Sequence, residues 1–147
     1  MTKGTTITNK RAHYEYALEK DKIEAGLVLT GGEAKAIRTG HADLSRSVAR
    51  VVNGEIWLIN ANIPVLGAKI EPTRSRKLLL HQSEILSLAT KMKQRKLTLV
   101  PLKLYTRGHF IKLNLGLGKP KHKFEKKEQI KKRDIERDIS QQLRNKI

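Results

Sequence analysis

The stretch Ser47–Asn60, which reads SVARVVNGEIWLIN, decides the fold of this chain. Two runs rich in β-branched and other apolar residues flank the dipeptide Asn53-Gly54. Asn-Gly is typical of a two-residue type I′ turn, because both central residues of that turn have positive φ. The stretch therefore predicts a β-hairpin with strands over residues 47–52 and 55–60. We expect Trp57 to pack in or against the core.

Alternating apolar residues predict two further strands before this hairpin. Tyr14, Tyr16 and Leu18 alternate along the chain, as on one face of a strand. A charged break follows, and a second strand is expected from Ile23 to Leu29.

A second hairpin is predicted after residue 96. Leu97, Leu99, Leu102 and Leu104 indicate one strand, and apolar residues alternate from Ile111 to Leu117 in a second. The segment Thr106–His109 contains a glycine and is the expected turn. Pro101 cannot donate a hydrogen bond to a sheet, so it places the first strand at an edge or at a bulge.

Helical spacing indicates two helical regions. Gly31-Gly32 opens a short helix over Glu33–Arg38, which Gly40 is expected to end. Residues 61–73 hold two prolines and a glycine and predict a loop. From Arg74 onward, a helix or helix pair is expected, because apolar residues then recur at spacings of three and four. These residues are Leu78, Leu79, Leu80, Ile85, Leu88, Ala89 and Met92.

Short strands, two hairpins and a mid-chain helix predict a mainly β fold with short helices. We expect a small oligonucleotide-binding-like β-barrel over residues 1–118, with a two-layer α+β domain as the alternative. Residues 119–147 hold 11 Lys+Arg and 5 Asp+Glu and are expected to form a basic C-terminal tail. Too few apolar residues lie in it to offset the entropy of ordering, so we expect it to be disordered until bound, and helical when bound.

Composition favours a nucleic acid as the partner. The 147 residues include 31 Lys+Arg and 14 Asp+Glu, a formal net charge of +17. Such an excess repels itself unless a polyanion neutralises it. No membrane anchor, signal peptide or apolar span accompanies the charge, so we expect a cytoplasmic protein that does not bind membranes. Aromatic residues make up 4% of the chain, which argues against a surface built mainly of stacking rings.

The residues of most catalytic and metal sites are missing or scattered. The absence of cysteine excludes disulfides, thiolate zinc sites and cysteine nucleophiles. The five histidines lack the spacing of a metal or acid–base site, so we expect no metal, no cofactor and no enzymatic activity. The pairs His13/Glu15 and Asp43/Ser45 have the residue types of hydrolytic sites, but their spacing arises often by chance. The glycines at Gly31-Gly32 and in Gly116–Gly118 are expected to mark turns rather than phosphate cradles.

Basic residues occur in four clusters that could converge on one face. Any single cluster is as readily a solvated surface as a phosphate contact. The total charge favours contacts with the backbone of an RNA whose shape the protein recognises. The clusters are Lys10-Arg11, Arg74–Lys77, Lys91–Lys96 and Lys119–Lys123.

Several blocks of the chain resemble the SsrA-binding protein family in order and spacing. The resemblance spans nearly the whole chain, and several blocks in the right order are more specific than any one of them. The blocks are Asn9–Ala12, Glu24–Leu27 continuing through Gly31 and Glu33 to Lys35 and Arg38, Glu55–Ile59, Pro72–His81 and Leu99–Tyr105.

This resemblance implies a barrel of the oligonucleotide-binding type that grips the tRNA-like domain of transfer-messenger RNA (tmRNA). It also implies that the tail enters the empty mRNA channel of the small ribosomal subunit and folds there as a helix against ribosomal RNA, near the decoding centre. Elongation factor Tu in complex with alanyl-tmRNA is a further partner that the resemblance implies.

The resemblance and the basic clusters together nominate the residues that contact RNA. Glu24 would accept hydrogen bonds from base edges or 2′-hydroxyls, or would orient a Lys or Arg by a salt bridge; both readings stay open. Tyr14 stands where the family often has histidine and keeps a stacking face. The nominated residues are Asn9, Lys10, Arg11, Tyr14, Glu24, Arg74, Arg76, Lys77, Leu80, His81, Lys119 and Lys121.

The tail departs from the family's pattern. Phe124, Glu125, Lys126 and Lys127 stand where the family commonly has His-Asp-Lys-Arg, and Lys127 lacks the planar guanidinium. With Ile135, on the apolar stripe of the tail, they are the candidates for contacts near the decoding centre. The loop from Pro64 to Glu71 is shorter than the family's.

Two other readings share the same composition. A general structured-RNA binder of the ribosomal or tRNA-chaperone type would have the same charge, barrel and tail. An RNA-processing enzyme with an unrecognised site is the third reading.

Overall fold

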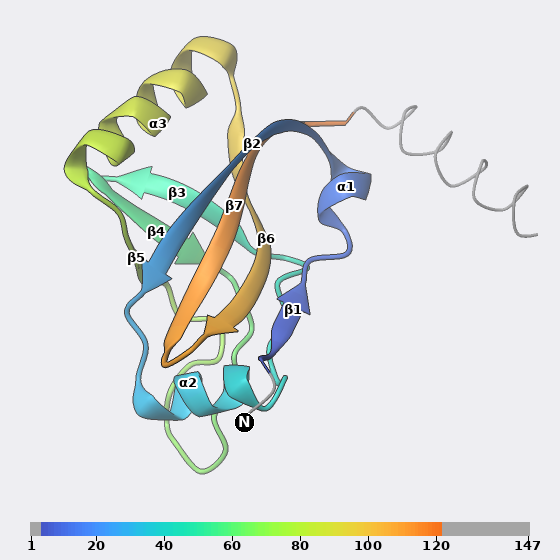
Figure 1. Ribbon diagram of the computed structural model, residues 1–147, viewed down its shortest axis with the longest axis vertical. Helices are drawn as coiled ribbons and strands as arrows, with labels where there is room; N and C mark the ends of the chain where they lie inside the picture. The colour runs from blue at the N-terminus through green and yellow to red at the C-terminus, as the bar shows by residue number, and fades with distance from the viewer. Residues whose placement is uncertain (1–3, 122–147) are drawn as a thin grey trace, which may run out of the picture.

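The structure is a computed structural model that describes residues 4–121 (Figure 1). The elements in chain order are β1 (Thr6–Thr8), α1 (Ala12–Glu15), β2 (Tyr16–Leu27), α2 (Gly31–Arg38), β3 (Val48–Val52), β4 (Glu55–Ile59), β5 (Arg76–Leu79), α3 (Gln82–Arg95), β6 (Thr98–Arg107) and β7 (Phe110–Pro120).

The strands form a nearly closed antiparallel ring. The order is β1-β6-β3-β4-β5-β2-β7, and β7 also pairs with β6, so six strands return on themselves while β1 adds to β6 from outside. The ring is weakest between β3 and β6, which share one pair, Ala49 with Leu99. The predicted mainly β barrel with short helices is therefore confirmed.

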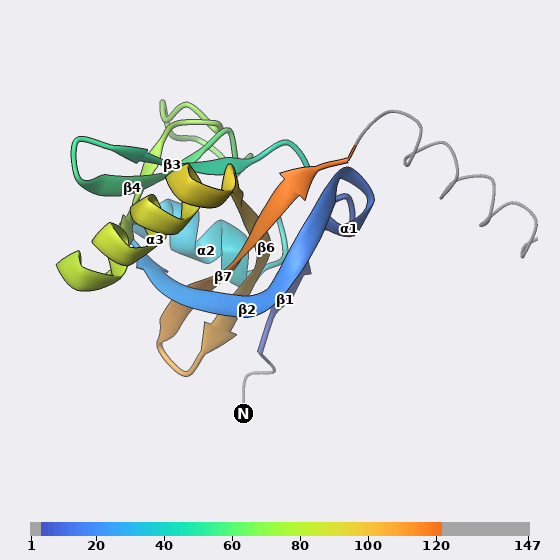
Figure 2. The ribbon, with the colours of Figure 1, turned by 90° about the horizontal axis from the view of Figure 1, so that it is seen from above.

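Leucine and isoleucine fill the inside of the ring. Alternate residues of β4 and β5 are buried. Two helices close the barrel at opposite ends (Figures 1 and 2). At one end α2 contributes Ile37, and at the other α3 contributes Ile85 and Leu88. Burying each such side chain stabilises the fold by about 1.5–3 kcal/mol. The fully buried strand residues include Ile56, Leu58, Leu78, Leu99, Leu104, Leu113 and Leu115.

The β3–β4 hairpin confirms the prediction from Asn53-Gly54. Asn53 has φ 51 and Gly54 has φ 76, as a type I′ turn requires. The expectation for Trp57 was wrong. Its neighbours Ile56 and Leu58 take the inward positions, so the alternation of the strand turns Trp57 outward, where it is half-buried.

The N-terminal strands differ from their prediction. Residues 12–15 form the short helix α1, so Tyr14 lies in a helical turn, and β2 is one continuous strand of 12 residues. The charged break is an irregularity in the pairing with β7 between Leu18 and Lys22. Lys20 and Asp21 remain exposed there, so charged residues interrupt the register without ending the strand.

The run from Arg74 to Leu80 was expected to begin a helix and instead forms β5. The strand lies between β2 and β4, and partners distant in the sequence supply its hydrogen bonds. Helix α3 starts only at Gln82, where Glu84 accepts a hydrogen bond from the His81 N–H at 3.4 Å.

The second hairpin is confirmed as β6 and β7, joined at Gly108. Pro101 lies beside a bulge, but β6 is not an edge strand, because β1 and β7 flank it. Strand β7 runs on to Pro120, so Lys119 and Pro120, assigned to the tail, still pair with β2. The tail candidates Phe124–Lys127 and Ile135 lie outside the described residues.

Gly116 and Gly118 mark a close approach of strands rather than a turn. Both lie inside β7, and a Cβ at Gly118 would come within 2.9 Å of Leu18 Cδ2 and 3.1 Å of the Ala17 carbonyl oxygen. The expected turn at these glycines was therefore wrong.

Helix α2 is confirmed over Gly31–Arg38, and a capping box fixes its start. The Glu33 N–H donates to the Thr30 hydroxyl at 3.2 Å, and the Thr30 N–H donates to the Glu33 carboxylate at 2.9 Å. Gly40, with φ 81, follows the helix as expected.

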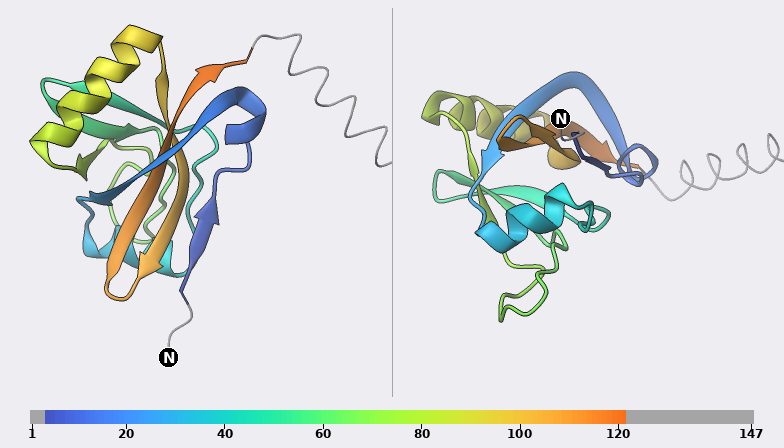
Figure 3. Two further views of the ribbon diagram at one scale, coloured as in Figure 1. Left: turned by 45° about the horizontal axis from the view of Figure 1, so that its top comes forward. Right: turned by 60° about the horizontal axis from the view of Figure 1, so that its bottom comes forward.

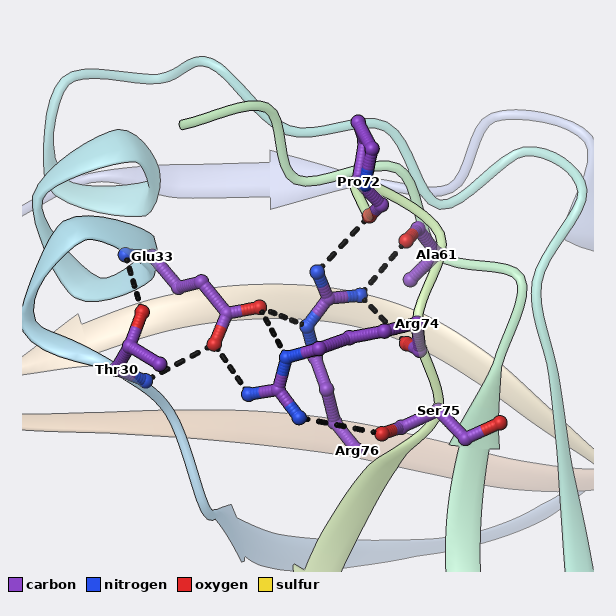
Figure 4. Close-up of polar contacts among 7 residues, drawn as sticks. All are labelled: Thr30, Glu33, Ala61, Pro72, Arg74, Ser75 and Arg76. Carbon is purple, nitrogen blue, oxygen red and sulfur yellow. Dashed lines mark hydrogen bonds and ion pairs between the residues drawn. The ribbon is translucent and has the colours of Figure 1, made fainter. Parts of the chain in front are cut away.

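Glu33 also binds two arginines, of which Arg76 is buried and Arg74 is partly exposed (Figure 4). Arg76 Nε donates to Glu33 Oε2 at 2.6 Å and Arg74 Nε donates to the same oxygen at 3.0 Å. Arg76 further donates to the carbonyls of Ala61 at 2.8 Å and Pro72 at 2.9 Å. The side chains of Glu33 and Arg76 are both 0% exposed. This network joins α2, the loop after β4, and β5.

The network determines the protonation of Glu33. Burial alone would raise the pKa of this carboxyl, but hydrogen bonds from Arg74, the Thr30 amide and Arg76 outweigh burial and hold the pKa at about 2, below its ordinary 4.5. Burial lowers the pKa of Arg76, and Glu33 opposes that shift. Both groups stay charged at neutral pH.

Glu33→Gln is expected to destabilise the fold by about 3–5 kcal/mol, because it leaves the buried Arg76 charge uncompensated. Urea unfolding measures the change. Glu19→Gln is the matched control, since its pair with Arg95 at 3.3 Å is exposed and is worth about 0–1 kcal/mol. A comparable loss in both variants would contradict a special role of the buried network.

Acid should remove the same contribution. Folding lowers the pKa of Glu33, so the ionised carboxylate stabilises the native state fully above pH 4.5, and this stabilisation is lost as the pH falls towards 2. Unfolding free energies measured across that range should fall more steeply for the wild type than for Glu33→Gln.

Candidate nucleic-acid interface

Four of the nominated residues meet in one pocket on the outer side of the barrel. Glu24 comes from β2, Lys77 from β5, and Leu80 and His81 from the link to α3. The pocket has a volume of about 510 Å³ and is called the outer pocket below. Its other lining residues are Gly26, Gly54, Glu55, Leu78, Leu79, Gln82, Glu84, Ile85 and Lys112.

Strand alternation and register place these side chains. In β5, Arg76 and Leu78 point inward, so Lys77 and Leu79 point outward. Across the outer face, Tyr105 pairs with Lys112, Lys112 with Gly26, and Gly26 with Leu79. A Cβ on Gly26 would lie 3.4 Å from Leu79 Cβ, so the glycine leaves the space beside Leu79 free of a second side chain.

Glu24 is held by side chains that come from β6. The Tyr105 hydroxyl donates a hydrogen bond to the Glu24 carboxylate, and Arg107 Nη1 lies 3.7 Å from it. Burial, reinforced by Glu24, raises the pKa of Tyr105 to about 12, so the hydroxyl keeps its proton. Glu24 remains 41% exposed. The structure thus shows the orienting salt bridge and leaves the carboxylate accessible to an RNA hydroxyl or base edge.

A second basic surface surrounds α1, and we call it the α1 surface. Lys121 Nζ donates to the His13 carbonyl at 2.8 Å, and the Lys121 N–H donates to the Glu15 carbonyl at 2.9 Å. Arg11 pairs with Glu15 at 3.3 Å. The exposed members are Lys10, Arg11, His13 and Lys119.

The two sites lie near opposite ends of β2, which arches across β7 (Figure 3). Glu24 is close to its C-terminal end, and α1 directly precedes its first residue, Tyr16. At about 3.3 Å per residue, the sites are roughly 25–30 Å apart along the strand. Of the four basic clusters, Lys10-Arg11 and the described start of Lys119–Lys123 meet at the α1 surface, whereas Lys77 of the cluster Arg74–Lys77 lies at the outer pocket.

Several nominated residues serve the fold. Arg76 is fully buried on Glu33, so direct contact with RNA is not open to its side chain. Arg74 is 33% exposed and holds the same carboxylate. Asn9 is 5% exposed; its amide donates to the Pro101 carbonyl at 2.8 Å and accepts from the Arg11 N–H at 3.2 Å. Tyr14 is half-buried in α1.

Sequence reasoning missed Leu79, Tyr105, Arg107 and Lys112 as members of this interface. Tyr105 and Glu24 lie 81 positions apart, and only the register of β2, β7 and β6 brings them together. The outward positions follow from the alternation of each strand, which is the signal that was available.

Asp43 and Ser45, one of the two side-chain pairs of hydrolytic type, are bonded to each other. Ser45 donates to Asp43 through its N–H at 2.9 Å and its hydroxyl at 3.0 Å, and these bonds lower the pKa of Asp43. They form a local turn. Between residues 4 and 121 no group of three His, Asp or Glu side chains is placed to hold a metal ion. Within the same range, no helix is long and apolar enough to cross a membrane.

Comparisons with known proteins match nearly the whole length of the chain to one family. A family model described as "SmpB protein" matches residues 6–145. The SsrA-binding protein of Sulfurihydrogenibium sp. (strain YO3AOP1) is 42% identical over 151 residues, which cover 100% of this chain and 99% of the relative. The SsrA-binding protein of Streptococcus agalactiae serotype III (strain NEM316) is 45% identical over 152 residues, covering 99% and 97%.

A solved structure is also similar. A chain of the structure "tmRNA-SmpB: a journey to the center of the bacterial ribosome" is 38% identical to this chain, with a TM-score of 0.68. The match covers 85% of this chain and 94% of that one. The family match and the full-length relatives show that the chain belongs to the SmpB family of SsrA-binding proteins.

Proposed function

We propose that this chain binds the tRNA-like domain of tmRNA and delivers it to stalled ribosomes in trans-translation. Its relatives are named SsrA-binding proteins, and the similar solved chain belongs to a tmRNA–SmpB complex. We assign RNA binding to the outer pocket because Glu24, Lys77, Leu80 and His81 all line it. The chain acts by binding, in keeping with its family.

The outer pocket offers the contacts that a folded RNA requires. Lys77 and Lys112 supply cations for phosphates, and Leu79, 52% exposed, supplies an apolar surface for a sugar or base. Glu24, held by Tyr105, accepts hydrogen bonds from 2′-hydroxyls or base edges. This combination reads the shape and the hydroxyls of RNA more than its sequence.

The α1 surface is proposed to serve the ribosomal side. Lys10, Arg11 and Lys119 lie where the chain leads into residues 122–147, which carry further basic residues. We assign to them contacts with RNA of the small subunit. The tail, with Phe124–Lys127 and Ile135, then enters the mRNA channel near the decoding centre. Elongation factor Tu bound to alanyl-tmRNA completes the delivery complex, which acts in the cytoplasm.

Preference for one RNA tests this function. The chain is expected to retain a labelled tRNA-like domain of tmRNA in the presence of excess bulk tRNA, as measured by mobility shift. Equal displacement by bulk tRNA would instead favour the general structured-RNA binder.

Affinity should fall steeply with salt. With on the order of 5 phosphate contacts, the plot of log affinity against log salt is expected to have a slope of about −4, because each contact releases counterions. Filter binding over a salt series measures it. A flat plot would mean that the charge of the chain does not act in binding.

Tyr105→Phe should weaken RNA binding by about fivefold, since it removes the one hydroxyl that fixes Glu24, a contribution of about 1 kcal/mol. Tyr16→Phe, a half-buried tyrosine at the other end of β2, is the matched control and should bind normally. Filter binding gives the affinities and thermal unfolding checks the fold. Equal affinities for the two variants would remove Tyr105 from the interface.

Truncation after Lys123 should leave the fold and RNA affinity nearly intact and abolish tagging on stalled ribosomes. Ile135→Pro refines the test, because proline costs roughly 3 kcal/mol of helix stability without changing charge. We expect this variant to bind RNA normally and to fail in tagging, as scored in a reconstituted translation assay. Normal tagging would show that the tail works without a helix.

A further inference from the structure

Trp57 lies on the outer face of β4 between two basic residues. The register places Arg50 of β3 directly opposite Trp57 on one side and Lys77 of β5 opposite it on the other. Residues opposite each other in adjacent strands have Cβ atoms about 4.5–5.5 Å apart. The single tryptophan of the chain therefore stands in the middle of a cation–aromatic–cation row.

The polar groups of this row are only lightly engaged within the protein. Among residues 4–121, the indole N–H of Trp57 and the guanidinium of Arg50 have no hydrogen-bond or ion-pair partner. Lys77 reaches only Glu55, at 3.8 Å and with both side chains more than 40% exposed. In the same range, the cation held over an aromatic ring is Lys112 over Phe110, so no described cation covers the ring of Trp57.

Exposed apolar residues lie beside the row formed by Arg50, Trp57 and Lys77. Val52 is 45% exposed and Leu79 is 52% exposed on the same face. Lys77, Glu55 and Leu79 also line the outer pocket, so the surface around Trp57 continues directly from the RNA interface assigned above. An apolar ring with cations on both sides matches a nucleotide, which presents a flat base and a phosphate on each side.

We infer that Trp57 is a stacking platform for one unpaired nucleotide of the bound RNA, with Arg50 and Lys77 placed for its flanking phosphates. The inference rests on the RNA binding proposed above and adds a nucleotide subsite to it. Arg50 and Lys77 are two strand spacings apart, about 10 Å, so one nucleotide lies within reach of both side chains. The subsite selects an unpaired base, because only an unstacked base exposes its face to the ring.

Intrinsic fluorescence tests the inference, since Trp57 is the only tryptophan. A transcript of the tRNA-like domain of tmRNA is titrated into the full chain, and a mobility shift records binding independently of the tryptophan. Stacking is expected to quench the emission of Trp57 and to shield it from acrylamide. A complete mobility shift with unchanged emission and acrylamide access would overturn the platform and leave the proposed function standing. The absence of any shift would overturn both.

Variants separate stacking from folding. Trp57→Leu should weaken binding by about tenfold or more, as the loss of one base–aromatic stack does, whereas Trp57→Phe keeps a ring and should stay within about threefold. Leu66→Ala is the control, an apolar side chain fully exposed in the loop after β4 and outside the outer pocket. Equal affinities for Trp57→Leu and Trp57→Phe would overturn the inference, and the wild-type titration decides alone if Trp57→Leu fails to fold.

Arg50 adds an independent measure. Arg50→Gln should lower the salt slope by about one, because one phosphate contact is lost, whereas Lys69→Gln in the loop after β4 should leave the slope unchanged. An unchanged slope for Arg50→Gln would remove Arg50 from the subsite.

Discussion

The ion pairs of the buried Glu33 carboxylate with Arg74 and Arg76 are the interaction on which the rest of the structure depends. The carboxylate receives the capping hydrogen bond of α2 and the guanidinium groups of Arg74 and Arg76, and Arg76 in turn holds the backbone of the loop after β4. This fixes where the chain re-enters the sheet as β5. Because β5 lies between β4 and β2, its position sets which residues face outward, and Lys77 and Leu79 reach the outer pocket as a result. A salt bridge inside the protein thus determines the position of residues in the proposed RNA interface.

Local signals predicted the elements that local chemistry stabilises. Asn53-Gly54 requires positive φ at two successive positions, and the β3–β4 hairpin follows from that alone. β5 was missed because three successive leucines fit a helix or a buried strand equally well, and its hydrogen-bond partners in β2 and β4 are distant in the sequence. Trp57 was misplaced for a related reason: hydrophobicity favours the core, but the alternation set by Ile56 and Leu58 had already assigned the inside of the strand.

The interface was predictable in part. Family resemblance and the basic cluster Arg74–Lys77 together nominated Glu24, Lys77, Leu80 and His81, and the structure brings them together. Residue type could not separate Arg76 from Lys77, although one is buried on Glu33 and the other exposed, because strand parity decides between them. Tyr105 and Lys112 were recognised as neighbours of Glu24 and Gly26 only from the pairing of β6, β7 and β2. What was missed is non-local register, which a single sequence does not contain.

The position of β7 in the ring has a mechanical consequence. This strand pairs along most of its length with β2 on one side and β6 on the other, whereas the weak seam of the barrel lies between β3 and β6. The chain leaves the barrel at the end of β7. A pull on the tail directed along the strand therefore loads two rows of hydrogen bonds in shear at the same time, rather than opening them one by one. Tension on the C-terminal segment therefore passes into β2 and β6, and the weak pairing of β3 with β6 does not lie between them and β7.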